Sequence, residues 1–147
     1  MRARPRSATP VLRWFSNGIC IRLITATPFV VRHGGLILGN LRVYLTESAL
    51  RIATSTLNSV RQRLDHLLAW LQERAPDIVC LQEIKCVDEA FPREPIEALG
   101  YHVETHGQKT FNGVALLSKI RLDHHSRGLD GDDGDLHARF IDGEVSH

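Results

Sequence analysis

A helical pattern between two apolar runs is the feature that most constrains the fold of this chain. The apolar residues of the helix recur at helical spacing and are Val60, Leu64, Leu67, Leu68 and Leu71. Ala75-Pro76 ends the helix, and the apolar run Ile78–Leu81 that follows is typical of a buried strand. A strand at Arg51–Thr54 precedes the helix. Because crossovers of this kind join parallel neighbours, the sequence predicts a βαβ unit and an α/β fold.

The remaining elements are predicted from local signals along the chain. Ser59 and Gln62 fit a capping box, which predicts that the first helix begins at Ser59. Further expected elements are a short helix at Glu94–Leu99, an antiparallel pair of strands at Tyr101–Thr105 and Gly113–Ser118, and a last strand at Ala138–Val145. Between them, Arg121–Asp135 is predicted to be a polar loop, with its aspartates and histidines solvated.

The charge distribution predicts a boundary near residue 50. Residues 1–50 hold seven Arg and one acidic residue, whereas residues 51–147 hold eleven Lys plus Arg and sixteen Asp plus Glu. We therefore expect residues 1–50 to be an unrelated, poorly ordered extension, with short ordered pieces around Ile19–Thr25 and Leu36–Leu45, and residues 51–147 to be one domain. The Arg-rich start is compatible with an organelle transit peptide, or with translated DNA upstream of a true start codon.

Composition limits the environment and the kinds of site. Three cysteines, Cys20, Cys80 and Cys86, form no zinc pattern and no disulfide framework, which favours a reducing compartment. Charged residues, a proline and a glycine pair interrupt the apolar region Ile19–Leu38, so no spanning segment and no membrane partner are expected. The expected location is cytoplasmic, or an organelle if residues 1–50 are a transit peptide.

One carboxylate stands where α/β proteins gather their ligands. Glu83 follows the apolar strand Ile78–Leu81, and ligands bind at the carboxyl ends of such strands. A carboxylate at this place is a candidate ligand for a hard cation such as Mg²⁺, although many strand-end glutamates are simply solvated.

Four segments carry a family likeness, and they are RIATSTLNSVRQRL, DIVCLQEIK, GYHVETHGQK and FNGVALLSK. Together they resemble the N-terminal part of the exonuclease III family of apurinic/apyrimidinic endonucleases, from about Arg51 to about Glu144. The resemblance implies a partial DNase I-like four-layer α/β sandwich, about one sheet with its helix layer. It also implies Mg²⁺-dependent hydrolysis of DNA phosphodiesters in base excision repair, including cleavage at abasic sites, with Mn²⁺ as an alternative metal and double-stranded DNA as the partner.

The resemblance assigns the metal site to the strand ends. Glu83 matches the metal-binding glutamate of the family. Thr56 stands at a position where the family has an asparagine that helps to organise the metal, and a hydroxyl lacks the reach and the fixed donor–acceptor pair of an amide. Asn58 keeps the second position of that motif, where it is either a contributor to the catalytic surroundings or a turn residue at the helix start.

The resemblance also places four residues against nucleic acid. Arg61 matches an arginine near the DNA backbone, although it is also an ordinary solvated helix residue. The other three lie in a loop that resembles a DNA-contacting loop and are Gln108, Lys109 and Phe111. A lysine can contact phosphate, and an aromatic ring can pack on a sugar or a base.

Several catalytic groups of the family have no match in these residues. The catalytic tyrosine, the Asp-x-Asn motif, a later aspartate and a final Asp-His pair all lie downstream of the matching stretch. We therefore expect an inactive fragment with weak or lost DNA binding and with an open apolar sheet face; no oligomeric state is predicted. Two alternatives remain: another phosphodiesterase or phosphatase of the same superfamily, and a noncatalytic fragment or binding module.

Overall fold

Two β-sheets and a helical layer make up the described part of the chain. The computed structural model describes residues 11–15, 32–33, 41–45, 51–128, 134 and 136–145. The strands are β1 (Val11–Phe15), β2 (Arg32–His33), β3 (Leu41–Leu45), β4 (Arg51–Thr56), β5 (Ile78–Gln82), β6 (His102–His106), β7 (Val114–Ser118), β8 (Leu122–Arg127) and β9 (Phe140–Val145). The helices are α1 (Leu64–Arg74), the 3₁₀-helix η1 (Asp88–Ala90) and α2 (Arg93–Glu97).

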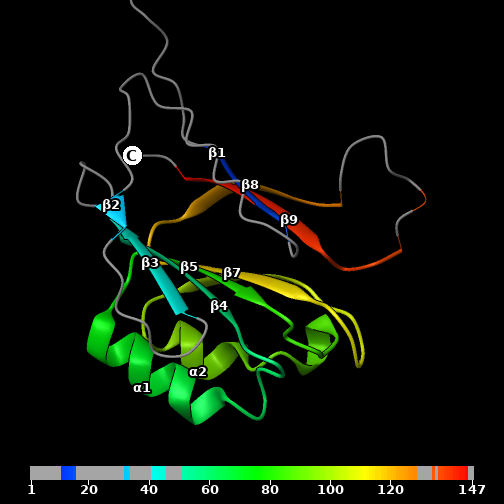
Figure 1. Cartoon of the computed structure of the whole chain (residues 1–147), viewed down its shortest axis with the longest axis horizontal. Coiled ribbons are helices and arrows are strands. Elements are labelled where there is room, and N and C mark those ends of the chain that lie inside the picture. The colour runs from blue at the N-terminus through cyan, green and yellow to red at the C-terminus, as the bar shows by residue number, and fades with distance from the viewer. Residues whose placement is uncertain are drawn as a thin grey trace, which may run out of the picture.

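The elements are stacked in layers. Strands β2-β3-β4-β5-β7-β6 form a six-stranded sheet in this order, and β1-β9-β8 form a three-stranded sheet. Helices α1 and α2 lie on one side of the larger sheet, and the smaller sheet lies on the other side (Figure 1). A mixed α/β arrangement with a helix layer on one sheet is the expected fold class, and this prediction is confirmed.

The βαβ unit is confirmed in its connectivity and its direction. Strands β4 and β5 are parallel, with Ile52 opposite Ile78 and Thr56 opposite Gln82. The predicted antiparallel pair is also present, because β6 pairs with β7. Strand β7 in turn pairs antiparallel with β5, which places β5 in the interior of the sheet. Both faces of β5 are covered, which explains why β5 is apolar at successive residues rather than at alternate ones.

Each face of the larger sheet is buried by a different layer. On the helix side, Val79 and Leu81 of β5 pack in one cluster with Leu67 and Leu71 of α1. The opposite face contributes Ile52, Ile78, Cys80, Val114 and Leu116, which cluster with Ile141 of β9. All six of these residues are at most 2% exposed. The expected open apolar face was therefore wrong: the smaller sheet lies on it, and these side chains are buried.

The predicted start of the first helix was also wrong. Helix α1 begins at Leu64, and its N-cap, Arg63, makes no side-chain capping bond. Ser59 instead has a positive φ of 86°, and its backbone N–H donates to the Glu83 carbonyl over 2.9 Å. A residue held in this left-handed conformation by the next strand cannot serve as the first cap of a helix. The predicted end is confirmed, because Ala75 forms a left-handed C-cap.

Part of the predicted polar loop is a strand. Residues Leu122–Arg127 form β8, which pairs with β9, while the aspartate-rich residues 130–133 and Asp135 lie outside the described residues. Strand β3 falls within the expected piece Leu36–Leu45, whereas β1 was not expected. The other expected piece, Ile19–Thr25, lies outside the described residues, and the boundary near residue 50 stays a prediction. Within the part of the chain that is described, no helix has the length and apolarity needed to cross a membrane.

Candidate functional site at the ends of β4 and β5

The parallel strands β4 and β5 bring three polar side chains to one edge of the sheet. Thr56 and Gln82 are the last residues of the two strands and lie opposite each other. The Thr56 hydroxyl donates to Oε1 of Gln82 over 2.7 Å. Glu83 follows directly and its side chain is 47% exposed. The predicted place of Glu83, directly after a buried strand, is confirmed.

Lys85 joins Glu83 to Asn58. Its Nζ donates to Oδ1 of Asn58 and lies 3.6 Å from Oε2 of Glu83. Asn58 and Glu83, which come from different loops, are therefore held together by one ammonium group. This pairing leaves Glu83 partly in solvent and places a positive charge beside it, so the local field is mixed rather than purely acidic.

Backbone hydrogen bonds hold three segments side by side at this edge. The Ser59 N–H donates to the Glu83 carbonyl, and the Val60 N–H donates to the Ile84 carbonyl over 3.1 Å. On the other side, the Lys85 N–H donates to the Asn112 carbonyl over 3.1 Å. The segment that carries Glu83 is thus fixed between the loop after β4 and the loop before β7, so its side chains project from a rigid frame.

The oxygen donors at this edge suit a hard divalent cation that keeps several waters. Glu83 offers a carboxylate, Asn58 an amide oxygen and Thr56 a hydroxyl, all of which are oxygen ligands of the kind that Mg²⁺ prefers. Across the described residues, no group of three or more His, Cys, Asp or Glu side chains is arranged to hold a metal. The residues therefore fit a cation bound through one carboxylate, and they do not fit a closed, fully protein-ligated cage.

The loop predicted to contact nucleic acid lies beside this edge. Lys109 is exposed and the Phe111 side chain is 66% exposed, which is unusual for a large aromatic residue. Gln108 behaves differently, because its Oε1 accepts from Nδ2 of Asn112 over 3.1 Å and from the Ala138 N–H over 3.0 Å. Gln108 therefore anchors the loop from within, while Lys109 and Phe111 project from it.

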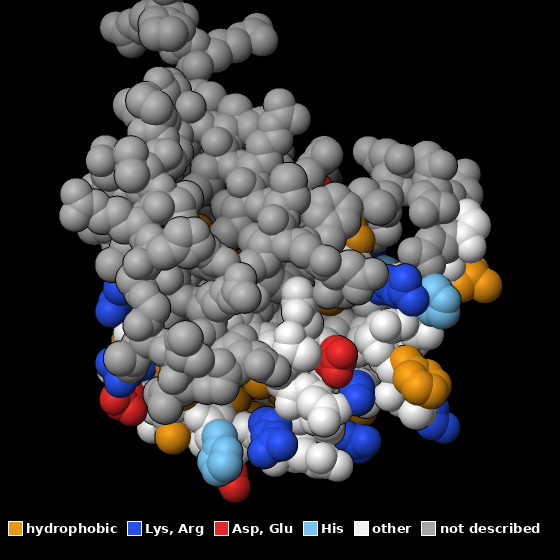
Figure 2. Space-filling view, in the orientation of Figure 1, with side chains coloured by type: hydrophobic (Ala, Val, Ile, Leu, Met, Phe, Trp, Pro, Cys, Tyr) orange, Lys and Arg blue, Asp and Glu red, His pale blue; other side chains and the backbone are white. Residues whose placement is uncertain are grey.

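Arg61 is exposed near the start of α1, as the predicted contact with a nucleic-acid backbone requires. Figure 2 shows basic side chains and an exposed hydrophobic side chain close to an acidic side chain on the lower half of the visible face. This combination of charges and apolar surface is compatible with a phosphate-bearing ligand.

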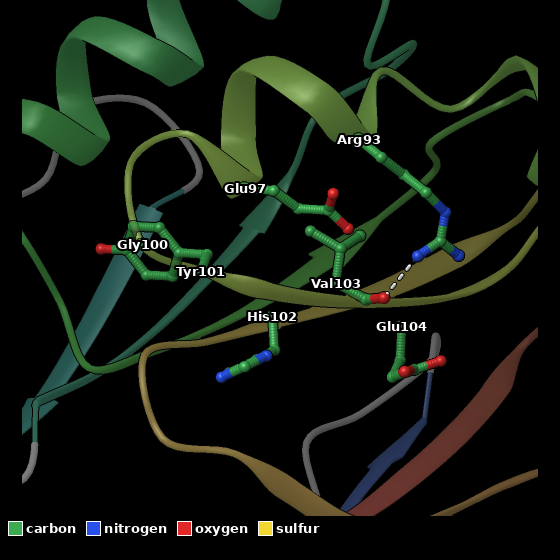
Figure 3. Close-up of a pocket in the computed structure, with 7 residues that line it drawn as sticks. All are labelled: Arg93, Glu97, Gly100, Tyr101, His102, Val103 and Glu104. Atoms are coloured by element: carbon green, nitrogen blue, oxygen red, sulfur yellow. Dashed lines mark hydrogen bonds between the residues drawn. The ribbon is translucent and has the colours of Figure 1, made fainter.

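A separate cavity lies along the edge strand β6, away from Glu83. It has a volume of about 450 Å³ and is lined by residues of α2, of the turn that follows it and of β6, which are Arg93, Glu97, Gly100, Tyr101, His102, Val103 and Glu104. Arg93 reaches from α2 to the Val103 carbonyl over 2.5 Å (Figure 3) and also donates to the Thr105 hydroxyl. These two hydrogen bonds hold its guanidinium at the outer edge of the sheet, where it blocks pairing with another strand.

The buried thiols and the buried phenol are structural groups. Burial raises the pKa of Cys80 to about 12 and also raises the pKa of Cys86, so neither thiol is an activated nucleophile. Burial, with a smaller contribution from nearby Asp77, raises the pKa of Tyr101 to about 12. The Tyr101 hydroxyl donates to the Pro76 carbonyl over 2.7 Å, which fastens the end of the crossover to the sheet.

Sequence reasoning gave no role to two residues that the structure makes prominent. Lys85 was noted only as part of the motif that carries the resemblance, and Asp88 was not considered. The signal for Lys85 is its place two residues after Glu83, because residues i and i+2 of an extended segment project to the same side. The signal for Asp88 was absent, since its contacts lie 19 and 39 residues away in the chain.

Known proteins share sequence with this chain. The chain is 44% identical over 92 residues to exodeoxyribonuclease III of Haemophilus influenzae and 31% identical over 81 residues to the DNA repair nuclease APEX1 of Danio rerio. These matches cover 63% and 52% of this chain. They cover 34% and 26% of the two relatives, so the chain spans about a third or less of their length.

Solved structures show the same fold. An AP endonuclease from Archaeoglobus fulgidus matches with a TM-score of 0.61 and 39% identity, over 65% of this chain and 37% of that protein. The 3′ phosphatase NExo from Neisseria, solved with a product DNA hairpin, matches with a TM-score of 0.65 and 36% identity, over 67% and 38%. Residues 33–146 match the sequence profile described as the Endonuclease/Exonuclease/phosphatase family, and the chain therefore belongs to this family.

Proposed function

We propose that this chain forms the cation-binding and nucleic-acid-binding part of an exonuclease III-type DNA repair nuclease. The observation that carries the proposal is the exposed Glu83 at the end of β5, held beside Asn58 in a chain that is 44% identical over 92 residues to an exodeoxyribonuclease III. The proposed reaction class is Mg²⁺-dependent hydrolysis of DNA phosphodiesters, including those at abasic sites, with Mn²⁺ as an alternative metal.

The proposed roles follow from the positions of the side chains. Glu83 would hold the cation directly, with Asn58 or Thr56 bonded to it or to its waters. When bound there, a divalent cation supplies positive charge against the phosphate and the leaving oxygen. Lys85 holds Glu83 and Asn58 at one place before a cation binds, and a cation that binds there displaces its ammonium from Glu83.

The nucleic-acid contacts would come from two sides of this edge. Arg61 supplies a charge for a phosphate from the start of α1, and Lys109 supplies another from the loop before β7. Phe111 offers an exposed ring for a sugar or a base. None of these groups distinguishes one base from another, so we propose recognition of the backbone rather than of a sequence.

Direct measurement of Mn²⁺ binding tests the metal part of this proposal. The chain should bind Mn²⁺ in titrations followed by electron paramagnetic resonance, and Glu83→Gln should weaken the binding by tenfold or more, since it removes the charged donor. Glu73→Gln is the matched control, because Glu73 is 68% exposed near the far end of α1 and pairs with the adjacent Arg74. Equal binding by the Glu83→Gln variant and the native chain would overturn the metal assignment.

Fluorescence anisotropy with a short DNA duplex containing an abasic-site analogue tests the nucleic-acid part. Lys109→Ala and Phe111→Ala should each weaken binding, and rising salt should reduce the effect of Lys109→Ala, because its contribution is electrostatic. The control is Arg121→Gln, which removes a positive charge from an exposed residue outside the proposed surface. If all three variants bound DNA equally, the loop would not be the contact surface.

A further inference from the structure

The Asp88 carboxylate uses both of its oxygens to join separate parts of the fold. Oδ1 accepts from the Gly107 N–H over 2.7 Å, and Oδ2 accepts from Nη1 of Arg127 over 2.8 Å. Gly107 begins the loop that follows β6, and Arg127 ends β8 of the smaller sheet. Asp88 itself opens η1, three residues after Lys85. A half-buried carboxylate with two short, charge-assisted bonds is a stiff connection.

Gly107 lies directly against the segment that precedes η1. A Cβ atom on Gly107 would lie 2.5 Å from the Cys86 carbonyl oxygen and 2.7 Å from the Asp88 nitrogen. This close approach is what brings the Gly107 N–H within reach of the Asp88 side chain. The hydrogen bond therefore fixes a contact that only a residue without a side chain allows.

The loop from Gly107 to Gly113 is fastened to one segment at both of its ends. At its far end, the Ile84 N–H donates to the Gly113 carbonyl and the Lys85 N–H donates to the Asn112 carbonyl, both over 3.1 Å. At its near end, Asp88 provides a side-chain attachment. The segment that carries Glu83 and the loop that carries Lys109 and Phe111 are thus joined through residues 84–88.

We propose that Asp88 is a positioning residue, which sets the loop of Lys109 and Phe111 at a fixed place relative to Glu83. This inference rests on the proposed function, since it concerns how nucleic acid is presented to the cation site. Arg127 acts through Asp88, because it holds the carboxylate in the orientation that meets Gly107. Without this attachment the loop remains joined to β6, to β7 and, through Gln108, to Ala138, but Gly107 is no longer held against the segment of Glu83, and DNA binding must first restore this placement.

Two variants with the same charge change isolate this role. Asp88→Ala removes the acceptor for the Gly107 N–H, whereas Asp88→Asn keeps one oxygen for that N–H and loses the charge and the second acceptor, which meets Arg127. Glu89→Ala is the matched control, because it deletes an exposed acidic residue next to Asp88. If Asp88 acted only through its charge, all three variants would bind DNA more tightly than the native chain, because each loses a negative charge. If Asp88 positions the loop, Asp88→Ala alone should bind DNA more weakly.

The test combines two readouts on the whole chain. Native-state trypsin cleavage after Lys109, followed by mass spectrometry, reports release of the loop. Anisotropy with the abasic-site duplex reports binding. We expect trypsin to cleave Asp88→Ala faster than the native chain. The same variant should bind DNA about threefold to tenfold more weakly. The thermal midpoint of the chain should be retained. Asp88→Asn and Glu89→Ala should be cleaved as slowly as the native chain and should bind DNA at least as tightly.

The outcomes separate the inference from the function on which it rests. Unchanged cleavage after Lys109 in Asp88→Ala would overturn the positioning role, and so would faster cleavage with unchanged or tighter DNA binding. Native binding that does not depend on Lys109 or Phe111 would overturn the nucleic-acid surface, and the inference with it. In that case the cleavage rate alone would still show whether Asp88 fastens the loop.

Discussion

Gly107→Ala is the substitution whose cost can be read most directly from the structure. A Cβ atom at this position would lie 2.5 Å from the Cys86 carbonyl oxygen, 2.7 Å from the Asp88 nitrogen and 2.8 Å from the Val87 carbonyl carbon. All three are backbone atoms of one segment, so no side chain can rotate out of the way. Either the loop or the segment must move, and the Gly107–Asp88 hydrogen bond of 2.7 Å is then lost or distorted.

Overpacking of this kind costs about 1–3 kcal/mol of unfolding free energy. For a chain of 147 residues, that lowers the thermal midpoint by about 3–9 °C. Gly134→Ala is the control, because a Cβ atom there has no neighbour within 4 Å, and its effect should stay within about 0.5 kcal/mol. Urea titrations followed by circular dichroism give the free energy of unfolding of both variants. Equal stabilities of the two variants would refute the reasoning, since they would mean that the close approach at Gly107 is not present in solution.

Three further predictions concern the cation site, the activity and the response to pH. Lys85→Gln should tighten Mn²⁺ binding, by at most about fivefold, because the cation no longer displaces an ammonium 3.6 Å from Glu83 and partly exposed ion pairs are worth about 0.2–1 kcal/mol. Weaker binding in a manganese titration would show that the lysine is needed to shape the site. The purified 147-residue chain should show no Mg²⁺-dependent cleavage of an abasic-site duplex in a gel assay, because the candidate site supplies one carboxylate and no assigned general base. Glu83-dependent cutting would contradict this. Because the buried thiol of Cys80 keeps its proton to about pH 12 whereas an unfolded thiol loses it near pH 9, its contribution to unfolding free energy should fall above pH 9. The slope is at most about 1.4 kcal/mol per pH unit. Cys80→Ala should reduce the slope of stability against pH in urea titrations between pH 9 and 11.

Local patterns predicted the elements whose apolar residues face a core. The helical spacing around Leu67 and Leu71 and the apolar run of β5 are both direct consequences of burial. Strand β8 was missed because its sequence contains a single apolar residue at one end, Leu122. Its pairing with β9 is supported by Ser126, whose N–H and hydroxyl both donate to Oδ1 of Asp142. Such a contact between distant residues leaves no periodic signal in the sequence.

The candidate site was predictable in its residue types but not in its geometry. The resemblance pointed to Glu83, and the βαβ rule placed it beside the loop after β4, as observed. The error at Ser59 has a physical origin: a serine with a glutamine three residues later has the chemistry of a cap wherever it occurs. Here the Ser59 N–H donates to the carbonyl of Glu83, directly after β5. This pairing across 24 residues overrides the local preference.

Left-handed backbone conformations mark the same region independently of any resemblance. Seven non-glycine residues in the described part of the chain have a positive φ, and one of them, Ala75, is the C-cap of α1. The other six lie in the three segments that meet at the strand ends and are Asn58, Ser59, Glu83, Lys85, Thr110 and Asn112.

Each left-handed conformation costs about 1–2 kcal/mol for an L-residue, so the concentration of six of them in one place needs compensation from the surrounding sheet. The backbone bonds among these segments provide it. Glu83 and Lys85 are two of these residues, and their side chains meet, with 3.6 Å between Oε2 of Glu83 and Nζ of Lys85. Strain that persists because its surroundings fix it is characteristic of sites that must hold groups ready for a ligand. This backbone feature therefore supports the placement of the candidate site at the ends of β4 and β5 without reference to the family.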